Sequence, residues 1–147
     1  MSYFRATDPF PLEAAEHNKL HEFYARLATG RLSTTRCTAC HRTAWPPRGF
    51  CAECTSDAFE WIDLPDHGAI HAFTVQDTGL PAGFPGPRVF AIVKVDGHRI
   101  FAVVRDADPA ALTIGQRVRL APLRVADDPN GQPRYLPAFE PVEGKRR

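Results

Sequence analysis

The stretch that decides the fold reads Cys37-Thr38-Ala39-Cys40, then ten residues, then Cys51-Ala52-Glu53-Cys54. Each Cys-x-x-Cys turn can direct two thiolates at one centre, and two such turns supply the tetrahedron of sulfur that suits zinc. The ten-residue spacer is long enough for a hairpin that returns the second turn beside the first. The sequence therefore predicts that one zinc ion binds to Cys37, Cys40, Cys51 and Cys54.

The predicted zinc ion is structural rather than catalytic. Four sulfur ligands close its coordination sphere and leave no position for water or substrate. The chain has only four cysteines, so none remains to act as a nucleophile. Disulfide bonds are the weaker interpretation, because we expect a cytoplasmic protein and that compartment keeps thiols reduced. Zinc binding is worth roughly 10–16 kcal/mol in zinc-finger peptides, which is enough to fold a module without a core of its own.

The charge balance argues against one large class of partner. The 147 residues carry 18 basic and 17 acidic side chains, so the chain offers no field that would gather a polyanion such as DNA. Its first residues lack the apolar stretch of a secretory signal, and no apolar run is long enough to cross a membrane. We therefore expect a soluble, cytoplasmic protein with no membrane partner.

A helix is expected before the zinc module, within an N-terminal helical segment at residues 1–30. Apolar residues recur at helical spacing between residues 8 and 30, and Gly30 marks a stop. The pattern consists of Leu12, Ala15, Leu20, Phe23, Tyr24 and Leu27. One stripe of such a helix must be buried. With so little chain before the zinc module, the covering surface could be another protein.

The remaining chain divides into three parts by composition. Residues 31–57 hold all four cysteines and form the predicted zinc ribbon. Residues 58–142 are β-rich with regular turn signals and form the predicted barrel domain. The last residues, 143–147, form a basic tail that we expect to be disordered.

The β-rich part carries the pattern of a small closed barrel. Asp96-Gly97, between two apolar runs, is the strongest short hairpin signal in the chain. Over residues 89–95 both alternating faces are apolar except at Lys94, which favours a closed barrel over an open sheet. Strands are predicted at residues 59–64, 69–76, 88–95, 98–105, 117–126 and 134–139. The predicted fold is mainly β with an N-terminal helix, a zinc ribbon and then a five-stranded OB-fold barrel.

A search for catalytic machinery finds no self-contained active site, so no catalytic residue is predicted. His17 and His21 lie one helical turn apart, but Asn18 stands where a zinc protease has its glutamate base. None of the serines lies in a Gly-x-Ser-x-Gly turn. His67, His71 and His98 lack both a nucleophile pattern and an obvious carboxylate partner. His41 directly follows Cys40 and could be a fifth donor or a proton shuttle, but a residue at this position more often adopts an unusual backbone conformation, which histidine tolerates.

The order of the motifs resembles that of a known family. We call each Cys-x-x-Cys turn a knuckle. The first knuckle is preceded by a helix with Phe23-Tyr24 and by the segment Gly30-Arg31-Leu32, and the second is preceded by Trp45-Pro46-Pro47-Arg48. Further matches follow the cysteines: Glu60-Trp61, Gly68-x-Ile70-x-x-Phe73-Thr74-Val75 and Ile114-Gly115-x-x-Val118. Over about residues 20–140, this ordered set resembles the zinc-ribbon plus OB-fold family encoded beside thiolase-type and other acyl-CoA enzymes. His41 departs from the family pattern, which usually has glycine after the first knuckle.

The resemblance implies a non-catalytic accessory subunit of an acyl-CoA-processing complex. Family members are described as partners of thiolases, HMG-CoA synthases, acyltransferases, or the aldolase and hydratase of steroid side-chain breakdown. For this chain it implies a rubredoxin-like zinc ribbon and a hetero-oligomer with a thiolase-like, acyltransferase or aldolase subunit. It also implies a CoA thioester bound jointly with that partner.

Six residues are candidates for contact with the partner or with CoA. Trp45 and Phe50 lie between the knuckles, and large aromatic residues dominate interface hot spots. Arg48 could reach a phosphate of CoA or a carboxylate of the partner. Phe84 is a bulky residue in a Gly/Pro-rich loop and could line a partner's acyl tunnel. The full set is Phe23, Tyr24, Trp45, Arg48, Phe50 and Phe84.

Two alternative functions stay open at this point. Zinc ribbons and OB barrels also bind single-stranded nucleic acid, and Phe73, Phe90 and Phe101 could stack bases. These residues alternate with aliphatic ones as core residues do, and the charge balance disfavours a nucleic-acid partner. The other alternative is a stand-alone acyl-CoA hydrolase or lyase that uses one of the unpaired histidines.

Overall fold

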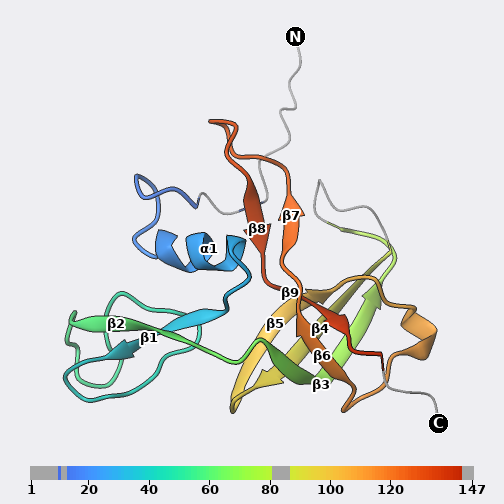
Figure 1. The fold of residues 1–147 in the computed structure, drawn as a ribbon, viewed down its shortest axis with the longest axis horizontal. Helices are drawn as coiled ribbons and strands as arrows, with labels where there is room; N and C mark the ends of the chain where they lie inside the picture. Colours follow the sequence, from blue (N-terminus) through green and yellow to red (C-terminus); the bar gives the residue numbers. More distant parts are fainter. Residues whose placement is uncertain (1–9, 11–12, 81–86, 144–147) are drawn as a thin grey trace.

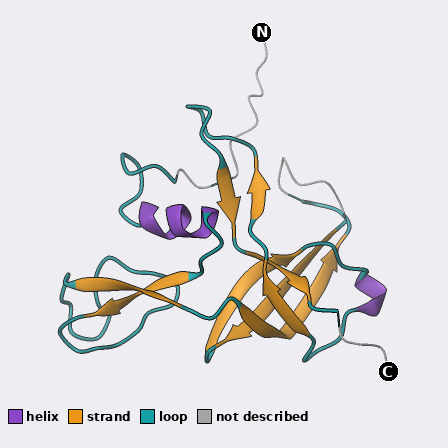
Figure 2. Ribbon diagram, viewed as in Figure 1, coloured by secondary structure: helices purple, strands orange, loops and turns teal. Residues whose placement is uncertain are grey.

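The computed structural model describes residues 10, 13–80 and 87–143 (Figure 1). Within them it has one α-helix, nine β-strands and one short 3-10 helix, η1 (Pro109–Ala111). The prediction of a mainly β chain with a helix, a zinc ribbon and a five-stranded barrel is confirmed. Figure 2 shows how the strands divide between the ribbon, the barrel and a separate hairpin.

The ribbon is built on one antiparallel strand pair. Strand β1 (Ser33–Cys37) pairs with β2 (Phe59–Asp63), from Ser33 opposite Asp63 to Cys37 opposite Phe59. β-Branched and aromatic residues favour extended backbone in both strands. Strand β2 lies in the segment 58–142, where the barrel is predicted, but its partner is β1 of the ribbon.

Five other strands close the barrel in the order β3-β4-β5-β9-β6. Their bounds are β3 (His67–Gln76), β4 (Arg88–Val95), β5 (His98–Val104), β6 (Arg117–Leu120) and β9 (Ala138–Pro141). The expected hairpin joins β4 to β5, and Asp96 and Gly97 have the positive φ values, 46° and 81°, that a two-residue turn of this kind requires. Strand β5 pairs with β9 in parallel, and the other barrel pairs are antiparallel.

Gly68 allows the barrel to close where β3 passes β4 and pairs with β6. Its pairing partner in β6 is Val118. A Cβ atom at this position would clash with the carbonyl oxygen of Lys94 and would lie 2.8 Å from Cγ2 of Val95. Any side chain here would therefore push β3 away from β4.

The prediction of continuous strands over residues 117–126 and 134–139 is wrong. Each is divided in two by a proline, Pro122 or Pro137, which has no amide hydrogen to continue the ladder. The outer halves, β7 (Leu123–Val125) and β8 (Arg134–Leu136), leave the barrel and pair with each other (Figure 2). This hairpin stands beside the helix, where β8 contacts α1.

The helix is shorter than predicted. Helix α1 runs over His21–Ala28, whereas residues 13–20 form turns, so the prediction of one helix over 8–30 is wrong for this part. The side chain of Asn18 accepts a hydrogen bond from the amide of Leu20, at 2.9 Å. Such a local bond competes with the helical pattern and favours a turn. The predicted residues 8, 9, 11 and 12 lie outside the described part of the chain.

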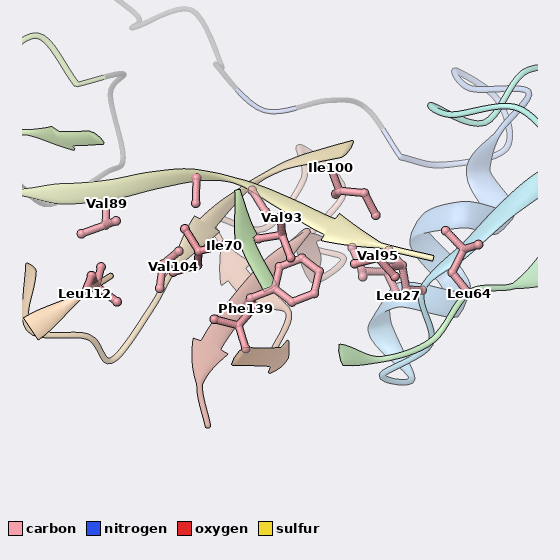
Figure 3. Packing of buried hydrophobic residues seen from close by; sticks show 14 of the residues in the cluster. Leu27, Leu64, Ile70, Val89, Val93, Val95, Ile100, Val104, Leu112 and Phe139 are labelled. Carbon is pink, nitrogen blue, oxygen red and sulfur yellow. The ribbon is translucent and has the colours of Figure 1, made fainter. Parts of the chain in front are cut away.

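One continuous core joins the helix, the ribbon and the barrel. Within the barrel, Val93, Ile100 and Phe139 are fully buried. Figure 3 shows Leu27 of α1 and Leu64, which follows β2, near Val95 of β4, and all three belong to the same buried cluster. Phe23 and Leu27 of the apolar stripe are therefore buried by this chain itself, whereas Tyr24 is half-buried and Ala15 is exposed. Cover of the rest of the stripe by another protein stays a prediction.

Candidate metal centre and contact surface

The four cysteines converge as a metal site requires. Their Sγ atoms all lie within 4.8 Å of one another. The Sγ atoms of Cys37 and Cys54 are 3.6 Å apart, and those of Cys40 and Cys51 are 3.5 Å apart. A tetrahedral ion with Zn–S bonds of about 2.3 Å places its sulfur atoms about 3.8 Å apart. The donor set and its dimensions therefore fit one zinc ion held by thiolates.

Two similar turns position these ligands. The amide of His41 donates to the carbonyl of Cys37, and the amide of Thr55 donates to the carbonyl of Cys51, both at 3.0 Å. His41 and Thr55 have left-handed backbone, with φ of 63° and 62°. The conformation of His41 follows the expectation for a residue that replaces glycine after a knuckle, and Thr55 takes the same conformation after the second knuckle.

Backbone amides prepare two of the thiols for ionisation. The amide of Cys40 donates towards Cys37 Sγ at 3.5 Å, and this contact lowers the pKa of the Cys37 thiol. The amides of Cys54 and Glu53 lower the pKa of Cys51 to about 6. Hydrogen bonds to a sulfur atom stabilise its charged form, which is the form that binds a metal.

The other two thiols resist ionisation in the metal-free chain. The amide of Arg42 acts to lower the pKa of Cys40, but the neighbouring sulfur of Cys51 and burial outweigh it and raise that pKa to about 12. The amide of Ser56 acts likewise on Cys54, but the neighbouring Cys37 raises its pKa. Four adjacent thiolates repel one another, and a divalent cation at their centre would remove that repulsion.

The loop between the knuckles is fastened to β1 by buried threonines. Thr34 and Thr35 are 0% and 2% exposed. The hydroxyl of Thr34 donates to the carbonyl of Ala44, and the amide of Arg48 donates to Oγ1 of Thr35 at 2.8 Å. The segment that carries Trp45 and Arg48 is thus held at both ends by the ribbon.

A groove of about 230 Å³ runs across the ribbon beside the cysteines. Arg48 is exposed at this groove, and Phe50 is 57% exposed. Trp45 also lines it but is half-buried, because its ring packs on Phe23 with centroids 6.0 Å apart. Of the contact candidates, Arg48 and Phe50 are therefore the most accessible within the described part of the chain.

Two other candidates lie away from this groove. Phe23 is only 7% exposed and packs in the core against Tyr24 and Trp45, so little of its side chain is accessible to a partner. Tyr24 is half-buried and lines a second groove, between α1 and β8, together with Glu13 and Arg134. Phe84 lies outside the described residues.

One exposed aromatic residue was missed as a surface feature. Phe101 is 64% exposed and stacks on Phe90, with ring centroids 5.6 Å apart and an interplanar angle of 6°. From their alternation with aliphatic residues, both phenylalanines were expected in the core. The signal that could have identified them is the alternation in β5, where Arg99 and Phe101 share one face and Ile100 and Ala102 share the other.

Three histidines, His67, His71 and His98, lie apart from the two grooves in the described part of the chain. Nδ1 of His67 lies 3.1 Å from the carboxylate of Asp66 at an exposed position. His71 is exposed, His98 is half-buried, and none of the three lines the grooves described above. Among the described residues, the four cysteines are the only group of three or more Cys, His, Asp or Glu side chains placed to share a metal. No described helix is long and apolar enough to span a membrane.

Comparisons with known proteins agree on both parts of the chain. Residues 25–60 match the rubredoxin-like zinc ribbon domain of ChsH2, and residues 61–121 match the C-terminal OB-fold domain of ChsH2. No curated protein matches.

Two solved structures share the fold. A chain of the Ltp2-ChsH2(DUF35) aldolase superposes with a TM-score of 0.70 at 24% identity, over 92% of this chain and 98% of that one. A DUF35-family protein of unknown function from Sulfolobus solfataricus superposes with a TM-score of 0.53 at 12% identity, over 82% of this chain and 83% of that one.

Proposed function

The chain belongs to the ChsH2 family of zinc-ribbon and OB-fold proteins, and we propose that it is a non-catalytic accessory subunit of an acyl-CoA-processing enzyme complex. The observation that carries the proposal is the extent of the shared fold, which spans 98% of a chain from an aldolase of the Ltp2-ChsH2(DUF35) type. An aldolase-type subunit is therefore the first partner to test, ahead of a thiolase or an acyltransferase.

The chemistry of the metal centre supports an accessory role. All four cysteines are needed as ligands, so a bound ion would have no open position for a substrate. The ion would serve to fold the ribbon and to hold the loop between the knuckles in place. Such an ion positions a surface and takes no part in bond making.

The ribbon groove is the first contact surface in this proposal. The exposed Phe50 offers an aromatic anchor, and Arg48 next to it forms no ion pair with a described residue. A guanidinium donates two parallel hydrogen bonds to a carboxylate or a phosphate. Arg48 would accordingly take a carboxylate of the partner or a phosphate of CoA, with the CoA thioester bound jointly by both subunits.

Isolation of the complex from the organism of origin tests the proposal. A tagged chain, expressed at its native level in the cytoplasm, should retain one acyl-CoA enzyme in stoichiometric amount, identified by mass spectrometry. The double variant Arg48→Ala, Phe50→Ala should retain clearly less of it. Ile114→Ala is the control, because Ile114 is an exposed apolar residue in the turn before β6, away from the ribbon groove. An eluate that contains only this chain would refute the proposal.

A further inference from the structure

The outer face of β3, β4 and β5 carries side chains that the barrel core does not use. Along β4 the residues Ala91, Val93 and Val95 point into the core, so the intervening residues face outward. Cross-strand pairing places the outward residues of β3 and β5 beside them. We call this surface the outer barrel face; its residues are Ala72, Thr74, Phe90, Ile92, Lys94, Arg99 and Phe101.

The centre of the outer barrel face is apolar and hollowed. Ile92 pairs with Ala72 on one side and with Phe101 on the other. Together with Phe90 they line a groove of about 210 Å³. A cavity of about 150 Å³ is enough to hold a benzene molecule, so this groove can receive one aromatic or large aliphatic side chain. An exposed Phe101 that stacks on the half-buried Phe90 beside such a groove is typical of an interface anchor.

One end of the outer barrel face carries two cations side by side. Lys94 and Arg99 are direct cross-strand partners, and like charges in such positions repel. Neither forms an ion pair with any residue in the described part of the chain. The face itself contains no aspartate or glutamate. A carboxylate from another molecule would offset both charges.

The apolar groove and the two cations favour one kind of ligand for the outer barrel face over the others. A second copy of this chain, packed through the same face, would bring two more cations and no carboxylate. A single-stranded nucleic acid needs a continuous basic groove, whereas this face has its cations at one end and the whole chain has a net charge of only +1. The outer barrel face presents side chains rather than a strand edge, because its strands pair with one another across it, so a partner that covers this face binds through side chains.

We propose that the outer barrel face docks a segment of the partner subunit in which an acidic side chain lies beside an aromatic or large aliphatic one. The apolar side chain enters the groove beside Phe101, and the carboxylate pairs with Lys94 and Arg99. The proposal rests on the accessory role proposed above, and it adds a second contact surface on the barrel to the one on the ribbon.

Site-directed crosslinking of the isolated complex tests this contact. The photoreactive residue p-benzoylphenylalanine replaces Phe101 in one sample and Ile114 in the other, since both native side chains are more than 60% exposed. We expect a crosslink from position 101 to one acidic, apolar segment of the partner, and none from position 114. Because both side chains are exposed, neither replacement should disturb the fold, which a thermal unfolding curve checks.

A charge-swap experiment tests the electrostatic part. Phe101→Ser should weaken binding of the purified partner at least tenfold, and Lys94→Glu combined with Arg99→Glu should do the same. Changing the crosslinked acidic residue of the partner to lysine should restore binding to the charge-reversed chain. Thr113→Ala, at an exposed position beyond the outer barrel face, should leave affinity unchanged.

The outcomes separate this proposal from the accessory role. A complex that forms normally with Phe101→Ser and gives no crosslink from position 101 would overturn the docking surface and leave the accessory role standing. Absence of any complex would overturn both. A crosslink between two copies of this chain, or salt-sensitive binding of oligo(dT) that is lost in Phe101→Ser, would replace the proposed occupant by a second copy or by nucleic acid.

Discussion

The four cysteines of the metal centre differ in the pKa of their thiols, which is lowered for Cys37 and Cys51 and raised for Cys40 and Cys54. Cys51, like Cys37, is stabilised as a thiolate by backbone amides, which lower its pKa to about 6. We expect Cys51→Ser to lower the zinc content from one ion per chain to well below that, measured by elemental analysis of the purified protein. Glu53→Gln, inside the same knuckle but not a ligand, should keep the full zinc content. Equal zinc in both variants would refute the assignment of the ligands.

Glu13 makes stability depend on pH. Burial raises its pKa to about 7. The amide of Tyr135 and the guanidinium of Arg134 act to lower this pKa, but burial outweighs them. The Oε1 atom of Glu13 is buried without a hydrogen-bond partner in the described residues. The folded state therefore binds a proton more tightly than the unfolded state, whose carboxyl titrates near 4.5. The stabilisation is fully present below pH 4.5 and is lost as the pH rises through about 7.

Replacement of this carboxyl by an amide should remove that dependence. We expect Glu13→Gln to stabilise the protein at pH 8 by about 1 kcal/mol, after allowance for solvent screening of a half-exposed group, and to have little effect near pH 5. Urea unfolding at several pH values measures the difference. Glu16→Gln, at a nearby exposed carboxyl, is the control and should keep the wild-type pH dependence. A stability gap between Glu13→Gln and wild type that is the same at both pH values would contradict this account.

At the scale of the element, the two knuckles store backbone strain after their second cysteines. Thr55 is β-branched and has a φ of 62°, a region that such residues rarely adopt. We expect Thr55→Gly to raise the free energy of unfolding by about 1 kcal/mol. Ala52→Gly, in the same knuckle without a positive φ, should lower it by a similar amount. Chemical unfolding of the zinc-loaded variants measures these free energies. A lower free energy of unfolding in Thr55→Gly would contradict the presence of backbone strain at this position.

Features that depend on local sequence could be predicted, whereas features that depend on contacts between elements could not. The cysteine turns and the Asp96-Gly97 hairpin depend on local chemistry, so the sequence identified them. The interruption at Pro122 and Pro137 was visible in the sequence, but the apolar runs on both sides suggested unbroken strands. The alternation in β5 indicates that Phe101 shares a face with Arg99, but only the pairing with Ile92 of β4 places that face outside the barrel. The burial of Phe23 depends on what α1 packs against, which no short run of neighbouring residues encodes.

At the scale of the whole molecule, the shared core predicts that ribbon and barrel unfold together. Leu27 is fully buried where helix, ribbon and barrel meet (Figure 3). We expect Leu27→Ala to cost roughly 2–5 kcal/mol. Both tryptophans, Trp45 and Trp61, lie in the ribbon, so their fluorescence reports on the ribbon while far-UV circular dichroism reports mainly on the barrel. Both signals should shift together in the variant.

The control for this prediction is Ile114→Ala, because Ile114 is 63% exposed and should cost little. Two separate transitions, with only the ribbon affected by Leu27→Ala, would mean that the two parts move independently. A single transition would support a rigid body that presents the ribbon groove and the outer barrel face to a partner in a fixed arrangement.

The accessory role is tested by measuring turnover of an acyl-CoA substrate by the purified chain, by the purified partner, and by increasing ratios of the two. We expect no turnover by the zinc-loaded chain alone. We expect the partner's activity or stability to rise with added chain and to level off at a fixed stoichiometric ratio. Turnover by the chain alone, abolished by replacement of His67, His71 or His98, would contradict the accessory role and establish an independent enzyme.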